Sequence, residues 1–324
     1  MTTRGHHGIL LSASSGPPPF VVSTLFAVVL YTGDGLSSRT ITSGVDLTGG
    51  GMVEIRPRTA NDGAFIFSDT GASPLVVPIN ATTAAAAAAA TFTSTGVDLT
   101  DATYNVNGRT YVAYFYKKAP RFFDVVPYTG NATNRTIAHS LGVAPGFIMT
   151  RRANSTGSLQ AYHTALGANT RRVMNGSPGS SNDLTAWNNT APTSSVFSLG
   201  TSSLTNTNTG TLYAFLWAHD VAGDGVIQAI SYTGNGTTPG PTVTPGWHPQ
   251  YVLSGRNNTT FAYQLDQTRT PGFSGSDAWV QFGSTNAEGS SALIALATGG
   301  VQFDGNTALN ASGALFFGLA IRAP

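Results

Sequence analysis

Three stretches of the chain repeat one hydrophobic pattern. Residues 107–119 (NGRTYVAYFYKKA), 209–220 (TGTLYAFLWAHD) and 312–323 (SGALFFGLAIRA) each have a glycine at the second position, after which large apolar residues alternate with small or polar ones. Alternation with a period of two predicts β-strands. No amphipathic helical pattern exceeds two turns, and the alanines at 84–90 are too short a run to hold a helix alone, so we expect a short helical turn or a loop there. The pattern predicts an all-β fold.

A second phrase recurs at matching places. It reads YTGDG at 31–35, YTGNA at 128–132 and YTGNG at 232–236, and a short apolar segment precedes each tyrosine. Glycine, asparagine and aspartate adopt positive φ angles easily, so a tight turn between two strands is predicted, with Gly33, Gly130 and Gly234 as structural turn residues. A binding loop is the competing interpretation.

The similarity extends beyond these phrases. HSLGVAPGFIMTRR (139–152) matches VTPGWHPQYVLSGR (243–256), AYH (161–163) matches AYQ (262–264), and AWN (186–188) matches AWV (278–280). The first copy lacks the proline and the tryptophan and is the most divergent. A repeat of about a hundred residues suits an independent β-sandwich of about seven or eight short strands. We therefore predict three tandem β-sandwich, jelly-roll-like domains.

The predicted boundaries are an N-terminal docking arm at 1–20 and β-sandwich repeats at 21–119, 120–222 and 223–324. The linkers are short, so adjacent domains are expected to pack against each other. The arm has too little apolar surface to fold alone and is expected to dock onto a neighbour. We expect the domains to stand end to end, with the first domain as the anchor and the later domains projecting outward.

Composition excludes several functions. Charged residues are 10% of the chain, against about 25% in an average domain. The net charge is +1 and basic residues occur in isolated pairs, so no nucleic-acid partner is expected. The apolar stretch 20–31 is too short to span a membrane, so no membrane insertion is expected. A neutral surface of threonine, serine, asparagine and glycine suits close packing between proteins.

Candidate chemistry is sparse. Of 15 acidic residues, only Glu54 and Glu288 are glutamates, and no carboxylate pair of the kind used in glycoside hydrolysis recurs in the three copies. The six histidines are scattered, no HExxH motif is present, and the chain has no cysteine. We find no Gly-x-Ser-x-Gly sequence in a strand–turn–helix context. We predict no enzyme, no catalytic residue, no metal site and no cofactor.

Aromatic side chains give the one candidate binding site. Trp247 lies beside Pro245 and Pro249, where exposure is plausible, and Tyr162 and Tyr263 stand in the matching AYH and AYQ segments. Exposed flat rings of this kind stack on sugars, so these three residues are candidates for surface or glycan binding. Trp187 and Trp279 occupy matching positions, and we interpret them as packing residues.

The combined motifs resemble a known family. YTGNG, the G-x-x-P-x-[FY] stretch, the segment AWNNTAPTSSVFSLG (186–200) and the glycine-led last strand are similar to a repeated β domain of structural and tail-associated proteins of tailed bacteriophages, particularly marine ones. Residues 121–220 carry the resemblance best, the third copy carries it moderately and the first weakly.

The resemblance implies a non-enzymatic virion protein located in the virion, in the tail or its fibre and tip, that mediates assembly and host-surface adhesion. Its expected partners are other virion proteins, further copies in a trimer or ring, and a host surface glycan. A capsid decoration or head-spike protein is the first alternative, and an array of carbohydrate-binding modules is the second.

Overall fold

The computed structural model describes residues 20–59, 63–175, 179–258, 262–284 and 286–324. Strands account for 46% of the chain and helices for 4%, so the fold is all-β, as predicted. Within the described residues, no helix has the length and apolar character needed to cross a membrane. The predicted docking arm lies outside the described residues except for Phe20.

The strands fall into three successive sets, which we call units 1, 2 and 3. Unit 1 contains η1 (Val22–Thr24), β1 (Phe26–Thr32), β2 (Arg39–Thr42), β3 (Gly51–Pro57), β4 (Ala64–Ser68), β5 (Leu75–Pro78), β6 (Ala86–Ala87), β7 (Ala90–Thr93), β8 (Gly96–Leu99), η2 (Ala102–Tyr104) and β9 (Thr110–Lys117). Unit 2 contains β10 (Phe123–Thr129), β11 (Arg135–Ala138), β12 (Pro145–Arg152), β13 (Gln160–His163), β14 (Thr170–Val173), β15 (Ser180–Asn182), β16 (Val196–Leu199) and β17 (Thr211–Ala218). Unit 3 contains β18 (Ile227–Thr233), β19 (Thr242–Val243), β20 (Pro249–Arg256), β21 (Ala262–Asp266), η3 (Pro271–Phe273), β22 (Asp277–Phe282), β23 (Gly289–Ser291), β24 (Ile294–Ala297), β25 (Gly300–Phe303), α1 (Thr307–Asn310) and β26 (Leu315–Arg322).

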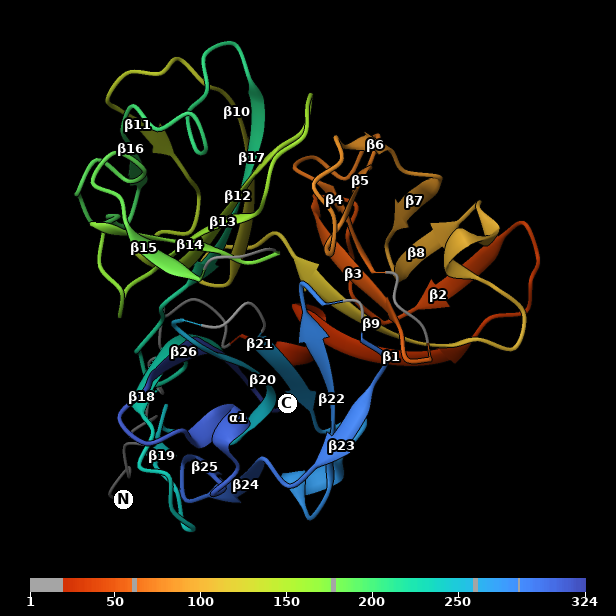
Figure 1. Ribbon diagram of the computed structural model, residues 1–324. Helices are drawn as coiled ribbons and strands as arrows, with labels where there is room; N and C mark the ends of the chain where they lie inside the picture. The colour runs from red at the N-terminus through yellow and green to blue at the C-terminus, as the bar shows by residue number, and fades with distance from the viewer. Residues whose placement is uncertain (1–19, 60–62, 176–178, 259–261, 285) are drawn as a thin grey trace, which may run out of the picture.

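Each unit has a six-stranded antiparallel sheet of the same strand order. The orders are β1-β9-β3-β4-β5-β6, β10-β17-β12-β13-β14-β15 and β18-β26-β20-β21-β22-β23. A small sheet accompanies each large one: β2-β8-β7 in unit 1, β11-β16 in unit 2 and β19-β25-β24 in unit 3. Each unit is therefore a β-sandwich (Figure 1).

Both faces of the large sheets are covered, which explains the almost continuous burial of their central strands. In β17, Leu212 and Leu216 lie on one face, while Phe215 and Trp217 lie on the other, and all four are buried. The first face contacts the small sheet of its own unit, whereas the second contacts the other units. Strands buried on both faces are typically apolar at nearly every position, and the three glycine-led runs of the sequence are β9, β17 and β26.

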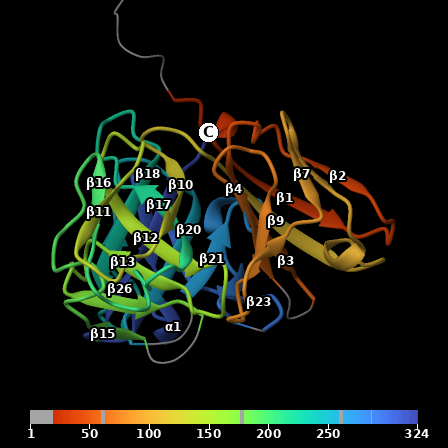
Figure 2. The ribbon, with the colours of Figure 1, turned by 90° about the horizontal axis from the view of Figure 1, so that it is seen from above.

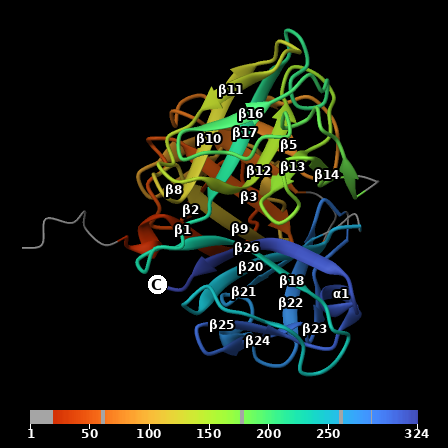
Figure 3. The same ribbon diagram turned by 90° about the vertical axis from the view of Figure 1, so that its left-hand side faces the viewer.

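An aromatic centre joins the three units. The Phe67 ring lies 4.9 Å from the Phe215 ring, which joins units 1 and 2. The His163 and Phe317 rings, 4.8 Å apart, join units 2 and 3. The Tyr251 ring lies 5.3 Å from the Tyr114 ring, which joins unit 3 back to unit 1. Since every pair of units is in contact, the units form a closed ring (Figures 1 and 3).

The expectation that the domains stand end to end is wrong. The inward faces of the three sheets share one apolar cluster, and no unit projects away from the other two (Figure 2). The physical reason is that these faces carry large aromatic residues, such as Tyr116 and Trp217, that can be buried only against another sheet. The expected close packing of adjacent domains is observed.

The helical turn that was one of two expectations for the alanine run does not form, and the run is a loop interrupted by a short strand. Residues Ala86–Ala87 form the short edge strand β6, paired with β5, and Ala90 begins β7, so no helical turn forms between residues 84 and 90. The amide of Ala85 donates to the carbonyl of Ala153 in unit 2. Contacts across the unit boundary and pairing with β5 override the helical propensity of alanine, which is weak in so short a segment.

Candidate functional site

The repeated Tyr-Thr-Gly phrase forms the same corner in each unit, where the chain leaves the large sheet for the small one. The tyrosine hydroxyl donates to a backbone carbonyl across the corner in all three copies: Tyr31 to Tyr104 at 2.7 Å, Tyr128 to Thr205 at 2.6 Å, and Tyr232 to Leu309 at 2.8 Å. Burial raises the pKa of each of these tyrosines, so the hydroxyl stays protonated and continues to donate.

A fully buried asparagine completes each corner: Asn105, Asn206 and Asn310. In unit 2, the Asn206 Nδ2 atom donates to the carbonyls of Thr133 and Gly200 at 2.8 and 2.7 Å, and its Oδ1 atom accepts from the amide of Asn131 at 3.0 Å. The sequence reasoning missed these residues. A signal was present, because each asparagine stands six positions before the residue that pairs with the corner tyrosine, for example Asn206 before Leu212.

The turn glycines lie at these corners, but the predicted reason is wrong. Gly33, Gly130 and Gly234 do not have positive φ angles; a Cβ atom at these positions would lie 2.0 to 2.2 Å from a backbone carbonyl oxygen. The left-handed conformation falls two residues later, at Gly35, Ala132 and Gly236. The corner is therefore a change of sheet that requires close backbone approach, and it is not a hairpin turn.

The three aromatic candidates do not form a common surface. Trp247 is 8% exposed and packs in the core of unit 3, and Tyr162 is 3% exposed and packs in the core of unit 2. Tyr263 is half-buried against Trp279, with ring centroids 5.1 Å apart. The exposed position expected for Trp247 and Tyr162 is wrong, because their rings fill the sandwich interiors.

Tyr162 and Tyr263 match in sequence but do not occupy equivalent positions in their sheets. Tyr162 pairs with Ile148, whereas Tyr263 pairs with Ser254, two residues from the equivalent Val252. The connection between β12 and β13 spans 153–159, but that between β20 and β21 spans only 257–261, which accounts for the offset. Trp187 follows β15 while Trp279 lies within β22, so these two tryptophans are not equivalent.

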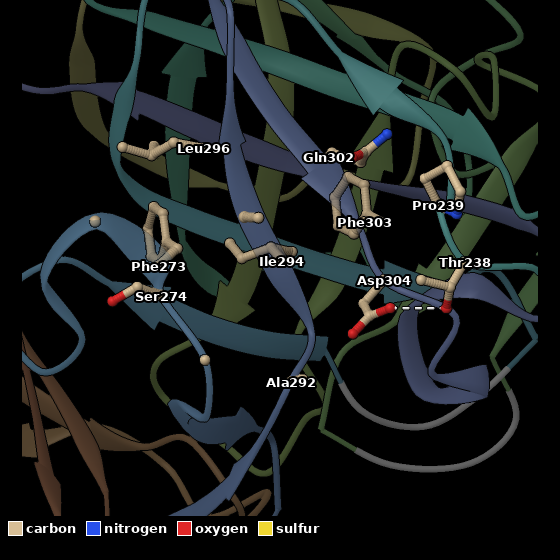
Figure 4. Close-up of a pocket in the computed structure, with 13 residues that line it drawn as sticks. Thr238, Pro239, Phe273, Ser274, Ala292, Ile294, Leu296, Gln302, Phe303 and Asp304 are labelled. Atoms are coloured by element: carbon tan, nitrogen blue, oxygen red, sulfur yellow. Dashed lines mark hydrogen bonds between the residues drawn. The ribbon is translucent and has the colours of Figure 1, made fainter.

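A crevice of about 510 Å³ opens in unit 3 between the loop at 272–275 and strands β24 and β25 (Figure 4). Its floor is apolar, and Ile294, Leu296 and Phe303 contribute to it. Among its described lining residues, Asp304 is the one carboxylate, and its Oδ1 atom already accepts from the Thr238 hydroxyl at 2.9 Å. The crevice offers an apolar hollow with a polar rim, whereas glycoside hydrolysis uses two carboxylates.

Charged side chains gather where units 1 and 3 meet, which we call the closing interface. The fully buried Arg269 Nε atom lies 2.6 Å from Asp266 Oδ2, and its Nη2 atom donates to the Tyr114 hydroxyl of unit 1 at 2.7 Å. Glu288 forms salt bridges with both arginines: its Oε2 atom lies 3.1 Å from Arg269 Nη1, and its Oε1 atom lies 2.6 Å from Arg58 Nη2 of unit 1. Burial raises the pKa of Glu288, but hydrogen bonds and charge from these arginines lower it overall.

Glu54 is the second buried acid of the closing interface. Its Oε2 atom accepts from Gln264 Nε2 of unit 3 at 2.9 Å, and its Oε1 atom lies 3.9 Å from Arg56 Nη1. Burial raises the pKa of Glu54 to about 7, against the opposing effect of the Arg56 charge. Arg56 in turn donates to the carbonyl of Gln281 at 2.9 Å, so this pair also connects units 1 and 3.

Arg121 binds Asp224, one of the residues of a second groove of about 470 Å³, which is lined by residues 20–22, 223–224 and 322–324. Its guanidinium lies 2.8 Å from Asp220 and 2.6 Å from Asp224, and 4.8 Å from the Phe20 ring. Arg121 also has a φ angle of 58°, which is uncommon outside glycine. One residue of the first linker therefore fixes the second linker and the beginning of unit 1.

One histidine serves the packing of two units. His163 is fully buried between units 2 and 3, with its Nε2 atom 2.9 Å from the carbonyl oxygen of Gly318, and burial lowers its pKa to about 4. In the described part of the chain, no three histidine or acidic side chains lie close enough together to hold a metal ion.

Comparison with known protein families decides the family. A family model described as a domain of unknown function, DUF7483, matches residues 119–322. The chain belongs to the DUF7483 family. A comparison with curated proteins finds no match. The DUF7483 match covers units 2 and 3 and the linker before them, whereas unit 1 lies outside the match although its large sheet has the same strand order.

Proposed function

We propose that this DUF7483 protein is a non-enzymatic structural component of a tailed-bacteriophage particle, located in the tail or its fibre and tip, where it mediates assembly and host-surface adhesion. The phage assignment rests on the resemblance of the repeated motifs. The observation that supports a structural role is that the chemically active side chains hold the units together. Arg269, Asp266, Glu288 and Glu54 bind across the closing interface, and Arg121 binds the linkers.

The closed ring also bears on the expected trimer or ring of chains. One chain already places three equivalent sheets around a shared centre, so it supplies by itself what three separate single-domain chains would build. We propose that the chain acts as one compact body within the particle. The groove lined by residues 20–22, 223–224 and 322–324 is the face suited to attachment to another virion protein.

Particle analysis tests the proposal. Purified particles of the virus that encodes the chain, separated into heads and tails, are to be examined by mass spectrometry and by labelling with an antibody against the chain. We expect the chain in the tail fraction with the label at the tail tip. A signal confined to heads supports the alternative of a capsid decoration or head-spike protein, and absence from both fractions rejects both functions.

The carbohydrate-binding alternative loses two of its three candidate side chains, because Trp247 and Tyr162 are buried, while Tyr263 is half-buried against Trp279. The crevice of unit 3 is one hollow that could take a small ligand, and its rim carries the amide of Gln302 and the hydroxyl of Ser274. A glycan array probed with the wild-type chain distinguishes adhesion through sugars from adhesion through protein contacts.

A further inference from the structure

Strand β1 is an edge strand without the usual protection. Its sequence, FAVVLYT, has no charge and no proline, and β9 lies on one side of it only (Figure 1). Natural edge strands are commonly protected by charge, proline or a covering loop, because their free backbone groups otherwise pair with another strand. The equivalent strands β10 and β18 are protected in this way, which makes a comparison within the chain possible.

The strand register defines the equivalent positions. Phe26, Phe123 and Ile227 pair with Tyr116, Trp217 and Ile321 at the same place in their sheets. Consequently Ala27 of β1 corresponds to Asp124 of β10 and to Gln228 of β18.

The polar side chains of β10 and β18 hold covering segments in place. Asp124 accepts hydrogen bonds from the amide and hydroxyl of Ser140, and Gln228 donates to the carbonyl of Pro245 at 3.0 Å. Ala27 has no polar side chain with which to hold such a segment. Val28 is accordingly only half-buried, whereas the equivalent Val125 is fully buried and Ala229 is 8% exposed.

The N–H group of Leu30 points away from β9, as a comparison with the equivalent Pro127 of β10 indicates. Leu30 pairs with Val112, and Pro127 occupies the same place in β10, opposite Tyr213. Proline has no N–H group, so a residue here cannot donate to the neighbouring strand of its own sheet. The two ends of the strand agree with this direction. The carbonyl of Leu25 accepts from the amide of Lys117, and the amide of Gly33 donates to the carbonyl of Arg109, so the odd-numbered residues bond toward β9. The N–H group of Leu30, and by the period of two that of Val28, points to the free edge.

Exposed apolar side chains lie on β1 and near its two ends. Leu30 is 38% exposed, Leu36 62%, Val106 37% and Val21 57%, and these four are on β1 or in the segments next to its ends. Gly33 connects the group, because it lies against the carbonyl of Val106 at the end of β1. An edge with outward donors and an apolar border is suited to adding a strand.

We propose that a second copy of this chain binds at this edge through antiparallel pairing of β1 with β1 about a two-fold axis at Val29. In this register Val28 of one copy lies directly opposite Leu30 of the other, on the same face, and the two residues exchange backbone hydrogen bonds. The strand is self-complementary because it has no charge to repel its copy, and the pairing covers the half-buried Val28 and the exposed Leu30 of each copy. The inference does not depend on the virion assignment.

The ends of the strand are compatible with this pairing. Asp34 near one end is paired with Arg39, and Lys117 near the other end is paired with Asp46, so these four charges offset one another. Two seven-residue strands bury less surface than the about 800 Å² per partner of a standard interface. We therefore expect reversible association in the micromolar range or weaker.

Sedimentation velocity over about 1 µM to about 1 mM chain tests the proposal, since the upper value corresponds to very weak specific association. We expect the wild-type chain to pass from monomer to dimer. Leu30→Pro copies the residue of β10, so it should leave the sheet intact, as circular dichroism will check, and weaken association at least tenfold. Leu30→Lys is a second variant that keeps the N–H group and adds a charge at the edge.

A matched control and a deletion complete the experiment. Leu204→Lys places the same charge at another exposed leucine, in unit 2, and should leave the dimer unchanged. Removal of residues 1–19 should also leave it unchanged. A wild-type chain that remains monomeric, dimers that persist in both Leu30 variants, or a dimer lost with residues 1–19 would each overturn the pairing of β1 with β1.

Discussion

Replacement of Asn206 by alanine is the most direct test of the corner that recurs in the three units. The side chain is fully buried and makes three strong hydrogen bonds, to the carbonyls of Thr133 and Gly200 and from the amide of Asn131. A hydrogen bond contributes about 1 kcal/mol net, and partners left unpaired in a buried place add to the loss. We expect Asn206→Ala to lower the free energy of unfolding by about 3 kcal/mol.

Urea denaturation followed by circular dichroism measures this change, with the slope of the transition compared between variants. Asn208→Ala is the matched control, because Asn208 is exposed and lies two positions away, and it should change stability by less than about 0.5 kcal/mol. Equal effects of the two substitutions, or a loss below about 1 kcal/mol for Asn206→Ala, would refute the conclusion that the buried asparagine holds the corner.

Further predictions concern the ring and its interfaces. The pKa of Glu54 is about 7 in the folded chain and about 4.5 in the unfolded chain, so its contribution to stability is largest below pH 4.5 and is lost as the pH rises through 7. The unfolding free energy of the wild type relative to Glu54→Gln should therefore fall by about 2 to 3 kcal/mol between pH 4.5 and pH 8. A difference that does not change with pH contradicts this prediction. Arg269→Ala leaves Asp266 buried without its partner and should lower the unfolding free energy by about 3–5 kcal/mol, measured in urea. Gly130→Ala, with a Cβ 2.0 Å from a carbonyl oxygen, should destabilise by about 3 kcal/mol, against about 1 kcal/mol for Gly142→Ala, which has open space and a φ angle of 71°. Calorimetry should show one cooperative transition, because the units share a core; three separate transitions would indicate independent domains.

The sequence was sufficient to predict the fold class and the last strand of each unit. The alternation in 110–117, 211–218 and 315–322 locates β9, β17 and β26, because a period of two is a local property that survives packing. The corner tyrosines were located for the same reason, since each ends an apolar strand. The roles of the neighbouring glycines were misjudged, because close approach of a carbonyl from a distant segment is not visible in local sequence.

Long-range features of the candidate sites were not predictable in the same way. Trp247 beside two prolines suggests an exposed loop, yet the loop folds over β18 and buries the ring. Glu54 and Gln264 are far apart in sequence, and nothing in either segment indicates that they meet across the closing interface. Burial of this kind depends on how the units pack, which short sequence patterns do not encode.

The covalent continuity of the ring has a consequence for its variation. In a ring of three identical chains, one substitution alters all three contacts at once, and the concentration of the chains determines what fraction is assembled into rings. Here each contact has its own residues. The junction of units 1 and 3 carries Arg269 and Glu54, whereas the other two junctions combine aromatic rings with Arg151 or with His163 and Arg172. A substitution can therefore alter one junction without the other two, and the ring of three units does not dissociate when the protein is diluted.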